Sequence, residues 1–179
     1  LRLPSIREQV ENEKVSADNG IWHIEAYVDE FDLPTEETYV VSSQLTGKFS
    51  NSTTNNSEVT AYVYCMKEAV SGYGVYEVIS IRLFEYGNYR VQNIFSESKA
   101  YDIVVMDNAG SKYYLSGSML AKGSEIMIGG DDAQVIIGAL QRGGTVRFAI
   151  TDNSVLTKYI LTIENADGFD AVYDQWWTE

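Results

Sequence analysis

Alternating apolar and polar residues dominate the chain from residue 21 onward. Because a strand places successive side chains on opposite faces, this period of two predicts half-buried β-strands. Eight runs rich in Val, Ile, Tyr, Phe and Thr follow it: Ile21–Val28, Thr38–Lys48, Val59–Met66, Val75–Tyr86, Ala100–Met106, Lys112–Met119, Thr145–Thr151 and Leu156–Ile163. Tyr89–Phe95 and Glu125–Ile128 are weaker runs of the same kind.

Turn-forming residues separate these runs. Asp107-Asn108-Ala109-Gly110 lies between two of them and is typical of a hairpin, since Asn and Gly tolerate the positive φ that such loops need. Many short strands joined by regular turns favour a sandwich or a barrel. We therefore expect a mostly-β fold, an antiparallel β-sandwich of about eight to ten strands.

Two helices are expected to interrupt the strands. Asp131 or Asp132 can cap a short inserted helix that carries four apolar residues on one face, Val135, Ile136, Ala139 and Leu140, and ends at Gly143-Gly144. A second, C-terminal amphipathic helix begins near Asp167. Its apolar stripe follows the spacing i, i+3, i+4 and i+7, with Phe169, Val172, Tyr173 and Trp176.

The first twenty residues lack the strand pattern. Ser5-Ile6-Arg7-Glu8 fits a capping box, but few apolar residues follow to anchor a helix. We expect residues 1–20 to form a tether or a loosely docked helix, and residues 21–179 to form one domain. The full length of 179 residues suits one domain.

The charge balance is acidic and disfavours a nucleic-acid partner. Asp and Glu number 26 against 13 Lys and Arg, a net charge of −13 that repels phosphate backbones. The acidity is concentrated at the two ends, residues 1–37 and 164–179, where it keeps the protein in solution. No apolar run approaches the roughly 20 residues of a transmembrane helix.

Catalytic motifs are missing from the sequence. His23 is the only histidine and no Gly-x-Ser-x-Gly segment accompanies it, so a Ser-His-acid triad is not expected. Ser96-Glu97-Ser98-Lys99 matches Ser-x-x-Lys without the other motifs of that enzyme class, which favours a polar loop. Cys65 lies in an apolar strand, where a thiol is inert. We expect no enzymatic activity, no catalytic residue and no cofactor.

Aromatic residues provide the candidates for ligand binding. The chain has 13 Tyr and 3 Trp, which suit both sugar stacking and β-sheet cores. Trp177, Trp176 and Tyr73 are the candidate sugar contacts, although Trp176 shares the apolar stripe of the last helix. A glycoside hydrolase that uses two carboxylates is a further alternative, for which the sequence nominates no pair.

One acidic segment resembles part of a calcium loop. Asn165, Asp167 and Asp170 are the only metal candidates, but the twelve-residue loop and its final Glu are missing. A helix cap explains the same residues, so we expect no metal.

Several segments together resemble a known group of proteins. The most specific is Gly47-Lys48-Phe49-Ser50-Asn51-Ser52, and Ile81–Gly87 and Ala166–Ala171 follow in the same order. The chain resembles a family of uncharacterised bacterial exported proteins and lipoproteins with a β-sandwich fold. It is more distantly similar to the invasion-associated locus B family of periplasmic proteins. Neither family implies catalytic residues.

The resemblance implies an extracytoplasmic location, in the periplasm or at the cell surface, with a lipid anchor upstream as one arrangement. We expect a non-enzymatic binding protein of the bacterial envelope, whose partner is a protein or an envelope glycan. The alternative is a carbohydrate-binding module that uses exposed Tyr and Trp.

Overall fold

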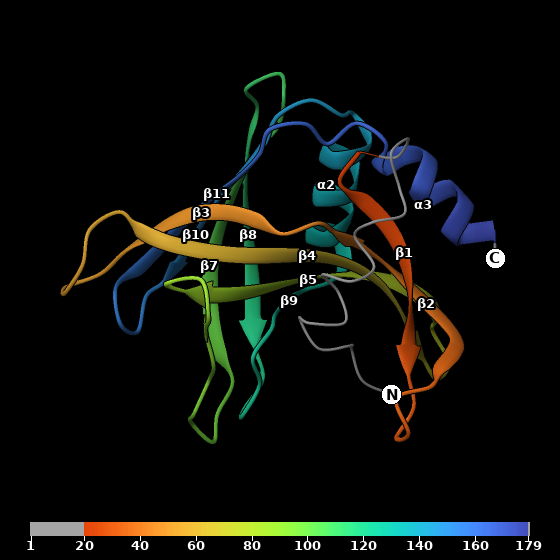
Figure 1. The fold of residues 1–179 in the computed structure, drawn as a ribbon, viewed down its shortest axis with the longest axis horizontal. Helices are drawn as coiled ribbons and strands as arrows, with labels where there is room; N and C mark the ends of the chain where they lie inside the picture. Colours follow the sequence, from red (N-terminus) through yellow and green to blue (C-terminus); the bar gives the residue numbers. More distant parts are fainter. Residues whose placement is uncertain (1–19, 179) are drawn as a thin grey trace.

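The computed structural model describes residues 20–178, which form a mostly-β fold. The strands are β1 (Trp22–Val28), β2 (Pro34–Ser42), β3 (Leu45–Ser50), β4 (Ser57–Val70), β5 (Gly74–Glu85), β6 (Tyr89–Arg90), β7 (Lys99–Met106), β8 (Lys112–Met119), β9 (Ile126–Ile128), β10 (Val146–Asp152) and β11 (Thr157–Ile163). The helices are α2 (Gly130–Gln141) and α3 (Phe169–Thr178) (Figure 1). The tether expected at residues 1–20 lies outside the described residues except for Gly20.

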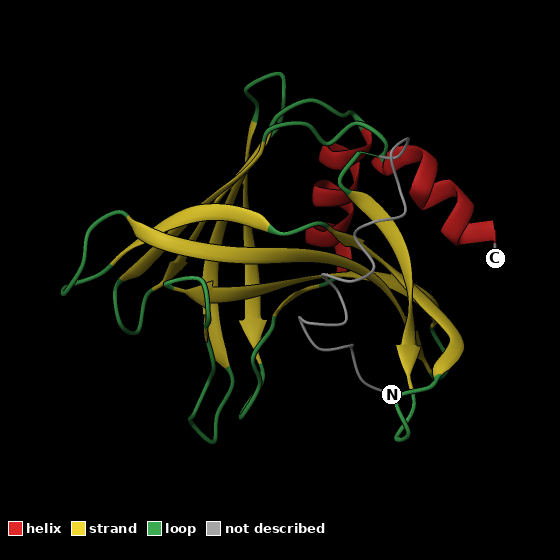
Figure 2. Ribbon diagram, viewed as in Figure 1, coloured by secondary structure: helices red, strands yellow, loops and turns green. Residues whose placement is uncertain are grey.

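The sheet closes into a barrel, so the predicted sandwich is wrong. Eight strands form the ring in the order β4-β3-β11-β10-β7-β8-β9-β5, and β5 pairs again with β4 (Figure 2). The closing contact is the longest ladder of the fold, with twelve antiparallel pairs from Val59–Glu85 to Val70–Gly74. Alternation along a strand shows only that one face is buried. Sandwiches and barrels share that property, so the sequence pattern could not distinguish them.

Most predicted runs correspond to strands, with one division. The run Thr38–Lys48 is divided at Ser43 and Gln44 into β2 and β3. Both strands pair with β4, β3 near its start and β2 further along, at Val40–Cys65 and Val41–Tyr64. The β1–β2 hairpin therefore extends the sheet beyond the ring.

Helix α2 packs against the barrel where its wall is incomplete. The short strand β9 makes only one pair with β8, Ser118–Met127. Beyond it, Asp132 of α2 accepts a hydrogen bond from the backbone N–H of Ser116 on β8, at 2.9 Å. Gln134 of α2 donates to Glu77 on β5, at 3.0 Å. The helix thus joins β8 to β5 and adds its buried face to the core.

The predicted cap of this helix is wrong. Gly129 is the N-cap and makes no side-chain hydrogen bond, while Asp131 and Asp132 lie in the first turn. The Asp132 carboxylate bonds to β8 instead of the helix's own N–H groups. Asp132 therefore holds α2 against the barrel wall and does not cap the helix.

Helix α3 docks on β1 and β2 through its apolar stripe, as predicted. Phe169, Val172 and Trp176 are buried. The Phe169 ring packs edge-on against Trp22, with centroids 4.8 Å apart, and the Trp176 indole donates to the Thr38 carbonyl at 3.1 Å. In the described part of the chain, no helix has the length and apolar character needed to cross a membrane.

We expect Gly47→Ala to destabilise the barrel by about 1–3 kcal/mol, because the new Cβ would lie 2.3 Å from the Ile160 carbonyl oxygen on the neighbouring strand. Gly138→Ala is the matched control. It lies inside α2 with only the end of the flexible Arg142 side chain nearby, so it should stabilise by roughly 0.5–1 kcal/mol. Urea unfolding measures both, and equal effects would contradict the packing at Gly47.

We expect Phe169→Ala to cost about 3–5 kcal/mol of unfolding free energy, since its ring is fully buried. Asp174→Ala, on the exposed side of the same helix, should change stability by less than about 0.5 kcal/mol. A loss below about 1 kcal/mol at Phe169 in chemical denaturation would mean that α3 is peripheral.

Candidate functional site

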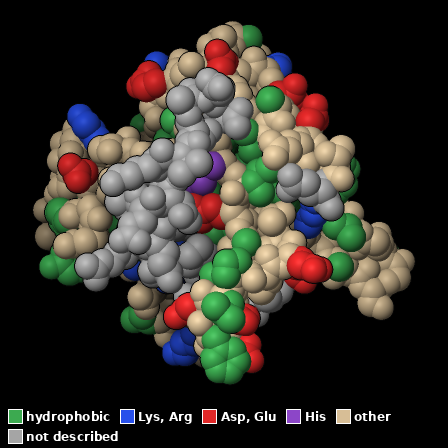
Figure 3. All heavy atoms as spheres, turned by 45° about the vertical axis from the view of Figure 1, so that its right-hand side comes forward, with side chains coloured by type: hydrophobic (Ala, Val, Ile, Leu, Met, Phe, Trp, Pro, Cys, Tyr) green, Lys and Arg blue, Asp and Glu red, His purple; other side chains and the backbone are tan. Residues whose placement is uncertain are grey.

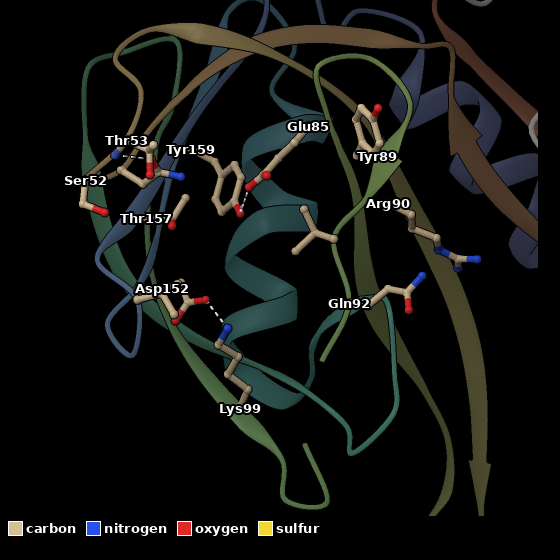
Figure 4. Close-up of a pocket in the computed structure, with 13 residues that line it drawn as sticks. Ser52, Thr53, Glu85, Tyr89, Arg90, Gln92, Lys99, Asp152, Thr157 and Tyr159 are labelled. Atoms are coloured by element: carbon tan, nitrogen blue, oxygen red, sulfur yellow. Dashed lines mark hydrogen bonds and ion pairs between the residues drawn. The ribbon is translucent and has the colours of Figure 1, made fainter. Parts of the chain in front are cut away.

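One end of the barrel opens into a cavity of about 400 Å³. It lies where β5 and β10 end and where β7 and β11 begin, and the turn after β3 forms part of its rim (Figure 4). Its lining is mostly polar: Asn51, Ser52, Thr53, Glu85, Tyr89, Arg90, Val91, Gln92, Lys99, Asp152, Val155, Thr157 and Tyr159. We call this cavity the barrel mouth.

The mouth is a polar layer above an apolar core. On β10, the buried residues alternate, and Ile150 of the core is followed two positions later by Asp152 of the mouth. On β11, Thr157 begins the same inward series that continues to Leu161. Because inward positions recur every second residue, the strand ends carry these polar side chains to one place.

An ion pair between Lys99 and Asp152 forms one side of the mouth. Asp152 is almost fully buried and Lys99 retains 14% exposure of its side chain. Asp152 also accepts hydrogen bonds from the backbone N–H and the hydroxyl of Ser154, at 3.0 and 2.7 Å. The turn between β10 and β11 therefore holds the carboxylate, and the carboxylate holds the lysine.

A second polar contact crosses the centre of the mouth. The Tyr159 hydroxyl donates to Glu85 Oε1 at 2.7 Å, and Figure 4 shows the two side chains facing each other. Burial raises the pKa of Tyr159 well above its ordinary value, and the hydrogen bond to Glu85 raises it further. Tyr159 thus stays a protonated donor at physiological pH.

One buried polar group near the mouth has no hydrogen-bond partner among the described residues. It is the hydroxyl of Tyr101, which follows Lys99 at the next inward position of β7. The Lys99 ammonium lies 5.8 Å from the centre of its ring. Burial raises the pKa of Tyr101, and the charges of Asp152 and Glu85 add to the effect, so the hydroxyl belongs to the electrostatic environment of the mouth.

The sugar contacts predicted from the sequence do not meet at this cavity. Trp176 is buried on the inner face of α3, and Trp177 is 43% exposed and stacks on Tyr173 with centroids 6.2 Å apart. Lys67 lies over both tryptophan rings, at 4.5 and 4.9 Å. Tyr73 is 89% exposed at the tip of the β4–β5 hairpin. The three residues do not line the mouth.

The calcium candidates make separate backbone contacts. Asn165 accepts from the backbone N–H of Asp167 at 2.9 Å, and Asp167 accepts from that of Gly144 at 2.8 Å. Asp170 is exposed in the first turn of α3. Across residues 20–178, no group of three or more His, Cys, Asp and Glu side chains is placed to hold a metal ion.

The nucleophile and base candidates are also dispersed. His23 contacts Glu25 of its own strand, with Nε2 and Oε1 3.0 Å apart, and lies partly exposed beside acidic atoms (Figure 3, purple). Cys65 is buried in the barrel wall, where burial raises the pKa of its thiol. Ser96 is exposed and Lys99 is paired with Asp152. Lys99 therefore belongs to β7 and lines the mouth. The prediction of a polar loop over Ser96–Lys99 did not include this position of Lys99.

The sequence analysis named none of the residues of the mouth as ligand contacts. A signal was present, since Asp152 and Thr157 flank a turn and interrupt the inward apolar series of two adjacent strands. Using it required the knowledge that β7 begins where β5 and β10 end. The contacts Lys99–Asp152 and Tyr159–Glu85 join residues more than fifty positions apart in the sequence and are not visible in local periodicity.

We expect Lys99→Met to destabilise the protein by roughly 3 kcal/mol, because it leaves the buried Asp152 carboxylate without its cation. Adding Asp152→Asn should recover about 1–2 kcal/mol, since the charge is removed while Ser154 keeps its acceptor. Lys122→Met, an exposed lysine at the same end of the barrel, is the control. Equal stabilities of the single and double variants in urea would refute a structural ion pair.

Comparison of the chain with known protein families, with characterised proteins and with solved structures finds no match in any of the three. The resemblance to exported bacterial proteins stays a prediction, and the function has to be argued from the mouth itself.

Proposed function

We propose that this chain is a non-catalytic binding domain whose ligand enters the barrel mouth. The observation that carries the proposal is a polar cavity of about 400 Å³ built on paired strand ends. Small-ligand sites commonly range from roughly 300 to 1,000 Å³ and often lie in the mouths of β-barrels. Lys99 and Glu85 are each fixed by a partner, so the site is organised before a ligand arrives.

The absence of an activated nucleophile in the lining supports binding rather than catalysis. Ser52, Thr53 and Thr157 are the hydroxyl side chains there other than tyrosine, and His23 is not in the lining. The extracytoplasmic location and the envelope partner expected from the resemblance belong to the same proposal. Fractionation of the native protein tests them.

A second candidate is a glycoside hydrolase, because Glu85 and Asp152 line the same cavity. Each carboxylate already has a partner, Tyr159 and Lys99 respectively. We therefore favour binding. Hydrolysis of nitrophenyl glycosides that is lost in Glu85→Gln and in Asp152→Asn would reverse this choice.

We expect at least one of four ligand classes to raise the melting temperature of the protein saturably: neutral sugars, sugar phosphates, dicarboxylates or polyamines. A ligand that binds only the folded state stabilises it by mass action. Thr157→Val should weaken that binding about fivefold, because it removes one hydroxyl of the mouth at nearly constant volume.

Thr162→Val is the control on the same strand. Thr162 lies outside the inward series and does not line the mouth, so its loss should leave affinity unchanged. If no class stabilises the protein, or if binding is the same in both variants, the barrel mouth is not the ligand site.

A further inference from the structure

Both cations of the mouth, Lys99 and Arg90, have an acidic partner. Lys99 is neutralised by Asp152. The Arg90 guanidinium points away from that pair in Figure 4, and its Nη2 lies 3.4 Å from Glu125 Oε1. Glu125 is also the closer partner of Arg82, so Arg90 is only partly neutralised, whereas Glu85 has no cation partner among the described residues. The mouth therefore carries no excess of positive charge, and the net charge of −13 opposes the approach of anions. A phosphate or carboxylate ligand would meet the Glu85 carboxylate and would gain no cation that is free of an acidic partner.

The remaining hydrogen-bonding groups of the mouth include both donors and acceptors. The Thr157 hydroxyl makes no hydrogen bond with the described residues and can donate or accept. Asn51 uses its oxygen to accept from the backbone of Thr53 and Thr54, at 2.9 and 3.0 Å, which leaves its amide N–H groups. Glu85 keeps Oε2 as an acceptor while Oε1 binds Tyr159. A ligand with several hydroxyl groups satisfies such a mixture, since each hydroxyl both donates and accepts.

An exposed aromatic ring stands at the rim. Tyr89 lines the mouth and is 68% exposed. Its ring packs edge-on against Tyr86, with centroids 6.3 Å apart, and Tyr86 packs in turn on Phe49. The ring is therefore supported from the side while remaining available to a ligand. An aromatic ring offers a large apolar contact at little conformational cost.

The Tyr101 hydroxyl is a buried polar group beneath the mouth, although Tyr101 is not among the residues that line the cavity. It is fully buried next to Lys99 and lacks a partner among the described residues. A buried hydroxyl without a hydrogen bond is a cost to folding. Phenylalanine would avoid that cost at nearly the same volume.

We infer that the barrel mouth binds a neutral sugar, of one or two rings, with hydroxyl groups on Thr157, Asn51 and Glu85 and one ring face against Tyr89. This rests on the proposed function and names its ligand class. It moves sugar recognition from Trp177, Trp176 and Tyr73 to the open end of the barrel.

The test is a calorimetric titration with methyl glycosides of glucose, galactose, mannose and N-acetylglucosamine, and with lactose and cellobiose. Glucose 6-phosphate, succinate and spermidine are the charged comparators. We expect a neutral sugar to bind and the charged compounds to give no heat. Tyr89→Ala should weaken the sugar about tenfold, and Tyr89→Phe should retain it because the ring remains.

Tyr73→Ala and Trp177→Ala are the controls, since both remove exposed aromatic rings outside the mouth. They should leave sugar affinity unchanged. Circular dichroism and thermal unfolding confirm that each variant is folded before its titration. Tyr101→Phe tests the buried hydroxyl separately: it should raise thermal stability without ligand.

The outcomes separate the two proposals. Binding of a charged comparator that depends on Thr157, with all sugars silent, overturns the sugar inference and keeps the binding site. Sugar binding that survives Tyr89→Ala but is lost in Trp177→Ala also overturns it and places recognition on α3. Failure of every compound to bind overturns both proposals.

Discussion

Closure of the barrel through the β4–β5 ladder is the constraint on which the rest of the structure depends. Twelve consecutive pairs hold these two strands together, and each strand also pairs with the ring on its other side. Val59–Met66 of β4 are buried at every position, because the inner face meets the main core and the outer face meets a second cluster around Tyr39, Tyr62 and Tyr64. If such a strand shifted its register by one residue, the side chains that face the main core and those that face the second cluster would exchange places.

The same closure explains why the mouth is polar and still ordered. Side chains at the ends of inward series are too close to solvent to join the core and too enclosed to remain unpaired. Lys99 with Asp152, and Tyr159 with Glu85, resolve this by pairing across different strands. Each pair fixes donors and acceptors in place, which lowers the ordering cost of any later ligand contact. The Tyr101 hydroxyl, buried beneath this layer, has no hydrogen-bond partner among the described residues.

The sequence predicted the elements well and their closure poorly. Strand alternation and the stripe Phe169, Val172 and Trp176 are local signals, and the structure confirms them. Whether the sheet forms a barrel or a sandwich depends on which strands distant in the sequence pair with each other. That information lies in pairs such as Val59–Glu85. The helix cap failed for a related reason: Asp132 finds its donor on β8, and local spacing cannot reveal a tertiary partner.

The aromatic residues show the same limit at the level of function. Tyr and Trp were candidates for sugar stacking because of their number, yet Trp176 donates to the Thr38 carbonyl and Trp177 stacks on Tyr173, which assigns both to the docking of α3. Tyr89 lies on the two-residue strand β6 at the rim, and its ring remains 68% exposed. Exposure alone does not identify a binding aromatic, since Tyr73 is 89% exposed at the tip of the β4–β5 hairpin; Tyr89 combines an exposed ring with a place in the lining of the mouth. That place follows from strand pairing: β6, which carries Tyr89, pairs with the end of β5, and β5 closes the barrel on β4. Recognition at the mouth therefore depends on the same ladder that closes the fold.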